Sequence, residues 1–200
     1  MNHYEPKTFT IPALNGISAQ NIEEHIKLYQ GYLKHVNLIS DHLKTLSDPN
    51  LPADQAGSYT YEIGELNRRF SFEFNGMRNH EYYFGQLEGG AQPLDMTSPL
   101  GQKITARFGG FNEFVTHMTN LALTRGIGWA VLWYDKEANQ LLTNWIDEQH
   151  LGHLNSAQFI FGIDVWEHAY VADYQPSGKK QYVTDYIAQV NWNVVSARIG

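Results

Sequence analysis

The sequence has 200 residues, of which 42% are hydrophobic and 18% charged, with no cysteine and a formal net charge of −7. Disulfides and thiolate metal sites are therefore excluded, and the acidic balance argues against the basic surface of a nucleic-acid-binding protein. The first residues, MNHYEPKTFT, contain no apolar signal segment, and the chain has no run of about 18 apolar residues that could span a membrane. These features predict a cytoplasmic protein that binds neither nucleic acid nor membrane.

The amino-terminal half shows helical periodicity. Residues 1–17 contain two prolines and predict an extended arm. Apolar residues then recur at helical spacing over about 21–46 and again over about 61–87. A proline-rich turn over 48–52 separates the two stretches. We therefore expect two long helices that form an antiparallel α-hairpin.

The pattern changes after Gly89-Gly90, where we place a boundary between an N-terminal domain, 1–88, and a C-terminal domain, 89–200, with the functional site between them. The second part predicts short helices over 98–108 and 112–124, strands over 128–134, 140–146 and 158–163, and helical structure over the last 30 residues. The predicted fold class is α+β: an N-terminal α-hairpin followed by a small three-stranded antiparallel sheet flanked by helices.

Three segments carry residues suited to metal binding. Asp164 and His168 are four residues apart and can reach one point if the chain turns helically there. His80 lies within an apolar helical stretch, and His25 shares a helix face with Tyr29 and Tyr32. Taken singly, each is more typical of an ordinary core or surface residue than of a ligand; taken together, they favour a metal site. Histidine and carboxylate together suit iron, manganese or zinc.

These segments also carry a resemblance. Asp164-Val-Trp-Glu-His-Ala-Tyr170 resembles the signature of the iron/manganese superoxide dismutase family. Four further segments resemble parts of that family in the same order along the chain: Ile17-Ser-Ala-Gln-Asn-Ile-Glu-Glu-His25, Asn79-His80 with the aromatic residues after it, Phe108–Phe114 with Gly126-Ile-Gly-Trp129, and Gln189-Val-Asn-Trp192. The resemblance covers nearly the whole chain, and the fold of this family agrees with the predicted architecture.

The resemblance implies that His25, His80, Asp164 and His168 together bind one iron or manganese ion. A water or hydroxide would be the fifth ligand. Cycling of that ion between +3 and +2 would convert superoxide to oxygen and hydrogen peroxide. Hydrogen bonds to the metal-bound solvent would tune the reduction potential. The sequence does not decide between iron and manganese.

The residues expected around the metal depart from the family's common pattern. Many iron enzymes of the family carry a glutamine four residues before the second ligand, where this chain has Gly76; manganese enzymes often have glycine there and supply the glutamine from the hairpin of the sheet. In that region we expect His150 to bond the metal-bound solvent, with Gln149 as the second candidate. Trp129 and Trp166 are expected to form walls of the site.

The entrance and the dimer contact are also inferred from the resemblance. The family usually has His-x-x-x-His-x-x-x-Tyr in its first helix; here Tyr29 replaces the second histidine as the expected gateway residue, and the tyrosine falls one residue early, at Tyr32. Glu167 and Tyr170 are expected to bridge two copies in a homodimer, which could assemble further into a tetramer. The tyrosine that pairs with the guarding histidine in relatives is Val171 here.

The remaining charged residues and histidines, and two alternative functions, complete the expectations. Local steering of the superoxide anion is expected from Lys27, Lys34 and Arg78, and four histidines are expected on the surface: His3, His35, His42 and His117. One alternative is a metalloenzyme of another class, such as an iron oxygenase or a zinc hydrolase. A second is a dismutase-like metal-binding protein without turnover.

Overall fold

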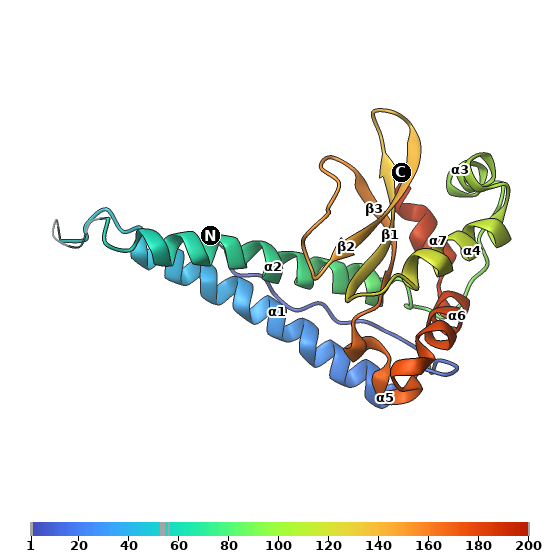
Figure 1. Cartoon of the computed structure of the whole chain (residues 1–200), viewed down its shortest axis with the longest axis horizontal. Coiled ribbons are helices and arrows are strands. Elements are labelled where there is room, and N and C mark those ends of the chain that lie inside the picture. The colour runs from blue at the N-terminus through green and yellow to red at the C-terminus, as the bar shows by residue number, and fades with distance from the viewer. Residues whose placement is uncertain (1, 53–54, 56, 200) are drawn as a thin grey trace.

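The computed structural model describes residues 2–52, 55 and 57–199 of the chain. A long helical hairpin occupies one side of the molecule, and a small sheet with shorter helices occupies the other (Figure 1). The elements are α1 (Ala19–Leu46), α2 (Thr60–Gly85), α3 (Pro99–Phe108), α4 (Phe111–Ala122), β1 (Gly128–Asp135), β2 (Gln140–Asp147), β3 (Gln158–Asp164), η1 (Glu167–Ala169), α5 (Val171–Tyr174), η2 (Pro176–Gly178), α6 (Lys179–Gln189), α7 (Trp192–Ser196) and η3 (Ala197–Ile199).

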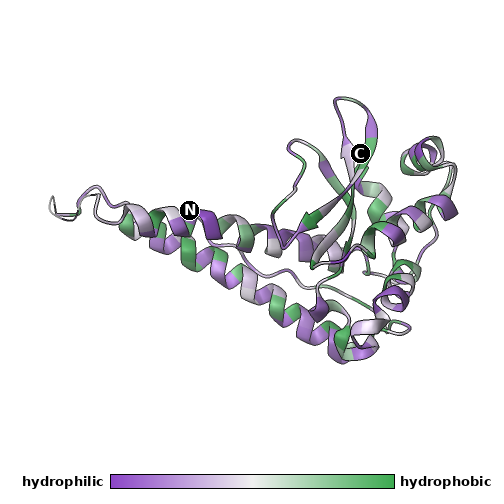
Figure 2. Ribbon diagram, in the orientation of Figure 1, coloured by the Kyte–Doolittle hydropathy of each residue, from purple (hydrophilic) through white to green (hydrophobic). Residues whose placement is uncertain are grey.

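The hairpin is built from two amphipathic helices. Helix α1 is capped by Ser18, whose side-chain oxygen accepts a hydrogen bond from the backbone N–H of Asn21 and so satisfies a free donor of the first turn. Its buried residues Ile22, Leu33 and Val36 pack toward the core. Hydrophobic and hydrophilic residues alternate along both helices (Figure 2), as expected when one face of each is buried.

The extended arm before α1 lies along the hairpin. The backbone N–H of Tyr4 donates to the side chain of Asn37 at 2.9 Å, and that side chain donates back to the carbonyl of Tyr4 at 2.9 Å. Farther along the arm, the backbone N–H of Lys7 donates to the hydroxyl of Tyr29 at 3.0 Å. The arm is therefore fixed to the middle of α1 at two positions, Tyr29 and Asn37.

A buried carboxylate, that of Glu81, joins the arm to both helices. Its oxygens lie 2.7 Å from Lys7 Nζ and 2.7 Å from Arg78 Nη1, and it accepts a hydrogen bond of 3.3 Å from the Tyr29 hydroxyl. Its side chain is only 6% exposed, whereas those of Lys7 and Arg78 are 57% and 35% exposed. The negative charge is thus desolvated and depends on these partners.

Replacing Glu81 by Ala is expected to lower the free energy of unfolding by about 1–3 kcal/mol, because Tyr29 loses its acceptor while Lys7 and Arg78 remain partly solvated. Urea denaturation of the metal-free protein measures the change. Glu65→Ala is the matched control, since Glu65 forms a pair with Arg68 in which both side chains are more than half exposed. Equal losses for the two variants would contradict a special contribution of Glu81.

The sheet is antiparallel, with strand order β2-β1-β3. The central strand β1 is buried along most of its length, and its register shifts against β3 between Leu132 and Trp133. At the start of β1, Trp129 pairs with Asp164 on β3 and with Ile146 on β2. The sheet thus brings Asp164 and the indole of Trp129 to the end that faces the helical hairpin.

Strand β3 lies at the edge of the sheet, next to the C-terminal end of α2. The side-chain amide of Gln86 joins the two. Gln86, just after α2, accepts from the backbone N–H of Gly162 and donates to its carbonyl, both at 3.0 Å. Arg198 near the C-terminus also donates to Gln86 and to the carbonyls of Ile160 and Tyr82. These bonds hold the edge strand against the hairpin and so fix one half of the site against the other.

The α+β fold class is confirmed, and the predicted element boundaries agree with the structure to within a few residues. Gly89 and Gly90, where we expect a domain boundary, lie after α2 at positive φ angles of 73° and 79°. The division into 1–88 and 89–200 remains a proposal. Among the described residues, no helix combines the length and apolar character needed to cross a membrane.

Candidate metal centre

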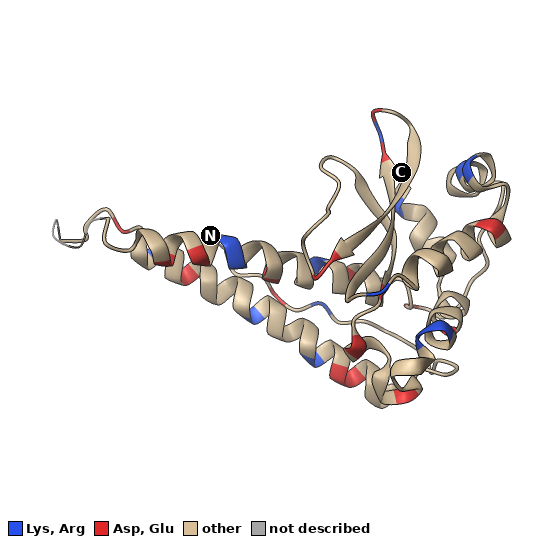
Figure 3. Ribbon diagram, viewed as in Figure 1, with Lys and Arg blue, Asp and Glu red and all other residues tan. Residues whose placement is uncertain are grey.

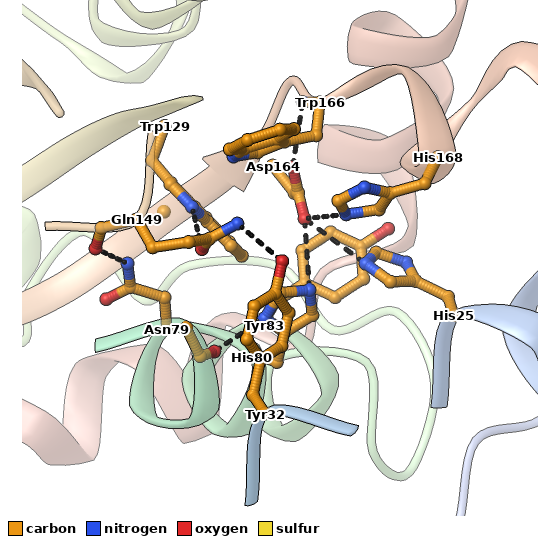
Figure 4. Close-up of polar contacts among 12 residues, drawn as sticks. His25, Tyr32, Asn79, His80, Tyr83, Trp129, Gln149, Asp164, Trp166 and His168 are labelled. Atoms are coloured by element: carbon orange, nitrogen blue, oxygen red, sulfur yellow. Dashed lines mark hydrogen bonds and ion pairs between the residues drawn. The ribbon is translucent and has the colours of Figure 1, made fainter. Parts of the chain in front are cut away.

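Four side chains from distant parts of the chain meet between the hairpin and the sheet (Figure 4). His25 comes from α1, His80 from α2, Asp164 from the end of β3 and His168 from η1. One potential ligand atom from each lies within 4.8 Å of all the others. The structure thus brings together the four residues expected as ligands, within one buried cluster.

A single oxygen, Asp164 Oδ2, is the point on which the imidazoles converge. It lies 3.1 Å from His25 Nε2, 3.3 Å from His168 Nε2 and 3.4 Å from His80 Nε2. The other oxygen, Oδ1, accepts the backbone N–H of Trp166 at 2.9 Å, which fixes the plane of the carboxylate. The 3-10 turn at η1 then brings His168 back over Asp164, as expected from their spacing.

His80 supplies the clearest test of whether a metal fits. Its Nδ1 lies 2.6 Å from the carbonyl oxygen of Gly76 and must donate to it, so Nε2 carries a lone pair. That Nε2 is buried without a hydrogen-bond partner and faces the Asp164 oxygen. Leaving a buried lone pair and a buried carboxylate oxygen facing each other is costly, and a cation bound between them would offset that cost. Three imidazole nitrogens and a carboxylate oxygen suit iron or manganese.

Burial keeps the two helix-borne imidazoles neutral. It lowers the pKa of His80 to about 3, with a further contribution from His25, and it lowers the pKa of His25 although Asp164 acts in the opposite direction. Burial alone would raise the pKa of Asp164, but contacts with His168 and His25 outweigh it and hold that pKa below its ordinary value. These are the protonation states in which such groups bind a metal.

A chain of hydrogen bonds borders the cluster. Trp129 Nε1 donates to Gln149 Oε1 at 2.9 Å, and Gln149 Nε2 donates to the Tyr32 hydroxyl at 3.0 Å (Figure 4). Asn79, next to His80, donates to the backbone carbonyl of Gln149 at 3.1 Å. The ring centroids of Tyr32 and Trp129 each lie 5.1 Å from that of His80.

Of the two candidates in the loop after β2, the structure places Gln149 in this chain of hydrogen bonds. The ring of His150 instead packs edge-on against Phe72 at 5.6 Å, and its Nδ1 lies 3.9 Å from Glu148. We expected His150, rather than Gln149, to bond the metal-bound solvent. That expectation is corrected in favour of Gln149, which lies in the chain of hydrogen bonds beside the cluster. The sequence could not show which of two adjacent residues turns inward.

Gly76 explains how Tyr32 reaches this position. A Cβ at Gly76 would lie 2.6 Å from Tyr32 Cδ1 and 2.9 Å from Cε1, so the phenol ring lies directly on the helix backbone. A larger residue at position 76 would displace that ring. A glutamine at position 76 is thus incompatible with the observed position of Tyr32, and Gln149 instead reaches the Tyr32 hydroxyl from the sheet side.

A groove of about 630 Å³ leads from Tyr32 and Trp166 along the cleft between α1 and α2. It is lined by Leu28, Gly31, Tyr32, His35, Leu38, Ile39, His42, Glu65, Leu66, Arg69, Phe72, Glu73 and Trp166. Tyr29, expected as the gateway, is fully buried and turns toward Glu81 instead. That expectation is corrected: the helix is regular here, and the position one turn after His25 faces the core rather than the groove.

The remaining expected residues take several positions. Trp166 forms a wall of the site, with its ring stacked 5.6 Å from that of His168. Glu167 is exposed. Tyr170 is only 4% exposed and stacks on Tyr182 within its own chain, and its expected role as a bridge between copies remains a prediction. The four histidines expected on the surface, His3, His35, His42 and His117, are all exposed.

Basic residues are scattered over the fold rather than gathered on one face in the view of Figure 3. Lys27 pairs with Glu24 and Arg78 with Glu81, and neither they nor Lys34 line the groove. Arg69 does line it: its guanidinium lies 3.9 Å from the centre of the Phe72 ring and 2.8 Å from Glu73. Sequence reasoning missed Arg69 because it is eleven residues from the nearest expected ligand, three turns along the helix.

Comparison with known proteins supplies the family. The profile of the iron/manganese superoxide dismutases, C-terminal domain, matches residues 96–198, just over half of the chain. The chain belongs to the iron/manganese superoxide dismutase family. It is 31% identical over 197 residues to an iron superoxide dismutase of Aquifex pyrophilus, a match that covers 97% of this chain and 90% of the relative.

Two further relatives show the breadth of the family. An iron superoxide dismutase of Pyrobaculum aerophilum is 30% identical, over 92% of this chain and 84% of the relative. A mitochondrial manganese superoxide dismutase of Schizosaccharomyces pombe is also 30% identical, over 87% of this chain and 75% of the relative. The expected function, an oxidoreductase that acts on superoxide with iron or manganese, is confirmed by these matches. They give no support to a relative without turnover.

Proposed function

We propose that His25, His80, Asp164 and His168 bind the metal directly, as one iron or manganese ion per chain. The observation that carries this proposal is the buried lone pair of His80 Nε2, which faces the Asp164 carboxylate without a proton donor between them. When bound, the ion supplies a one-electron couple between +3 and +2, through which one superoxide is oxidised to oxygen and a second is reduced to hydrogen peroxide.

The protein itself can contribute a proton to the step in which superoxide is reduced to hydrogen peroxide. Peroxide formation takes up two protons. The hydroxyl of Tyr32 accepts from Gln149, which leaves its own O–H to donate toward the groove. Burial, and secondarily Asp164, raise the pKa of Tyr32, so the phenol keeps its proton at neutral pH. We infer that Tyr32 holds a proton at its phenolic oxygen beside the substrate's path, and that Gln149 and Trp129 keep the phenol oriented.

Gln149→Leu is expected to lower turnover by about 10- to 100-fold with the metal content unchanged, since it removes an outer hydrogen-bonding partner and leaves Trp129 Nε1 unpaired. The measurement is a superoxide dismutation assay normalised to bound metal. His150→Leu is the control, because that ring packs against Phe72, lies near Glu148 and takes no part in the chain of hydrogen bonds, so near-normal turnover is expected. If His150→Leu lowered turnover more than Gln149→Leu, His150 and not Gln149 would be the residue that bonds the metal-bound solvent.

Arg69 is the basic residue best placed to guide the substrate. It lines the groove and is 47% exposed, while its partner Glu73 is almost wholly buried. Because superoxide is an anion and the protein as a whole is acidic, attraction has to act locally. We propose that Arg69, in place of Lys27, Lys34 or Arg78, provides this attraction at the mouth of the groove.

A homodimer is the proposed assembly, with tetramers as a further possibility. The support is Glu167, whose exposed side chain sits directly before the ligand His168 and for which the described part of the chain provides no ion-pair partner. In the arrangement implied by the family, this carboxylate bonds the ligand histidine of the other copy. Sedimentation over a range of protein concentrations checks it: a species of twice the chain mass supports the proposal, and a monomer at all concentrations contradicts it.

The decisive experiment is metal analysis by mass spectrometry beside a superoxide dismutation assay on the same sample. About one iron or manganese per chain, with turnover, supports the four-ligand proposal and identifies the metal. Zinc, or no metal in protein supplied with both ions, contradicts it. The result is informative because two observations favour different metals: the Aquifex relative is an iron enzyme, whereas Gly76 with a glutamine from the sheet follows the manganese pattern.

A further inference from the structure

A row of tyrosines leads from the metal centre through the core toward the surface. The ring of Tyr83 lies 5.0 Å from that of His25, and its hydroxyl lies 3.2 Å from the hydroxyl of Tyr182. The Tyr182 ring in turn lies 5.8 Å from the ring of Tyr174 in α5. Tyr83 and Tyr182 are buried, and Tyr174 is partly exposed. None of the three tyrosines is a proposed metal ligand, and none of them lines the groove beside Tyr32.

The two buried tyrosines cannot release a proton to a base. The Tyr182 hydroxyl donates to the backbone carbonyl of Asp164 at 2.9 Å, so the Tyr83 hydroxyl donates to Tyr182. A phenol and a peptide carbonyl are both poor proton acceptors. An electron taken from either tyrosine would therefore leave its phenolic proton with no stable acceptor. A tyrosyl radical would not be stable at Tyr83 or Tyr182.

Tyr174 differs from the others in its partner. Its hydroxyl donates to Asp185 Oδ2 at 2.8 Å, and Asp185 Oδ1 accepts from Gln181 at 2.9 Å. A phenol becomes a very strong acid when it loses an electron, and here a carboxylate lies ready to take the proton. Among the other ring neighbours of the row, Tyr186 bonds the amide of Gln86 and not a carboxylate. The row thus has one position where oxidation and proton release can occur together.

We propose that Tyr83, Tyr182 and Tyr174 form a path that supplies an electron to the metal centre when the product, hydrogen peroxide, reacts there. This inference rests on the proposed metal ligation. Peroxide takes one electron from the reduced metal and one from the path; its O–O bond breaks, and with two protons from solvent it becomes two waters. The electron originates at Tyr174, whose phenolic proton passes to Asp185. The radical therefore forms at Tyr174, which is partly exposed, and His25 and Trp129 beside the metal centre are spared from oxidation.

The test uses iron-loaded protein whose metal content and dismutation rate are measured first, so that failure of metal binding is distinguished from failure of the path. The iron is reduced, mixed with hydrogen peroxide and frozen for electron paramagnetic resonance. Peptide mass spectrometry then locates oxidised residues. We expect a tyrosyl radical signal and oxidation at Tyr174. The same protein loaded with zinc, which cannot donate an electron, is expected to give neither.

Two variants interrupt the path at different points. Tyr182→Phe keeps a ring in the core but is expected to lose most of the oxidation at Tyr174 and to gain oxidation at Trp129 and Tyr83. Asp185→Asn leaves the row of rings intact but removes the proton acceptor, and is expected to lower the radical yield at Tyr174. Should Tyr182→Phe alter the fold, the surface variant Asp185→Asn still tests the proposal.

Tyr174→Phe completes the set. It is expected to keep the dismutation rate and to lose activity faster under peroxide, because the interior residues then supply the electron. Tyr134→Phe is the matched control: Tyr134 is also partly exposed but bonds an amide, that of Asn139, at the hairpin of the sheet. Equal oxidation of Tyr174 in wild type and Tyr182→Phe, or oxidation confined to Trp166 and Tyr32 at the entrance, would overturn the proposal.

Discussion

Asp164→Ala is expected to release the metal and to abolish dismutation. All three imidazoles point at one oxygen of this carboxylate, so the substitution removes both a proposed ligand and the negative charge that would offset a di- or trivalent cation. Loss of an outer partner alone costs about 10- to 100-fold in metal affinity, and loss of the carboxylate among the four proposed ligands is expected to exceed that. Metal analysis after dialysis against a chelator measures it.

Asp41→Asn is the control for that variant. Asp41 lies on α1, is exposed and contacts only His3 by hydrogen bond and ion pair. Its replacement changes the net charge of the protein by the same amount but leaves the cluster intact. Metal retained by Asp164→Ala at the level of Asp41→Asn would show that the ion is bound elsewhere.

The stability of the metal-free protein is expected to fall steeply as the pH falls below about 6.5. His25 and His80 have pKa values below the ordinary 6.5 in the folded chain, that of His80 about 3, because burial disfavours their charged forms. Between these values the unfolded chain binds protons that the folded chain does not. Each such histidine therefore contributes stability that is complete above 6.5 and declines by up to about 1.4 kcal/mol per pH unit below it.

Urea titrations at several pH values between about 7 and about 5 measure this slope. His80→Leu removes one of the two groups and is expected to reduce the slope by up to about 1.4 kcal/mol per pH unit. His42→Leu, at an exposed position on α1, is expected to leave it unchanged. A slope that is the same in all three proteins would assign the pH dependence to other groups.

The backbone of this protein could largely be predicted from its sequence, because the decisive signals are local. The spacing of Ile22, Leu33 and Val36 on one helix face, the proline-rich turn after α1 and the short apolar run around Trp129 each act within a few residues. The four ligand positions were found through the resemblance rather than through spacing, since His25 and Asp164 are 139 residues apart. No local pattern predicts such a contact.

The surroundings of the site could be predicted less well, because they depend on which way single side chains turn. Whether Gln149 or His150 faces inward is decided by the bonds from Trp129 and Asn79. Tyr29 turns to the core because the amino-terminal arm and Glu81 offer its hydroxyl partners. The partners in both cases lie in other elements, and only the assembled structure brings them together.

The separation of the ligands along the chain has a consequence for biosynthesis. A ribosome adds about 5–20 residues per second, so about 7 to 28 seconds pass between the emergence of His25 and that of Asp164, 139 residues later. The helical hairpin, rich in local contacts, can form during that time, whereas the sheet cannot. Until β3 is complete, His25 and His80 are two histidines without their carboxylate. We therefore expect the ion to bind only after the chain is complete. The concentrations of iron and manganese in the cell at that time would then contribute to which metal the protein holds.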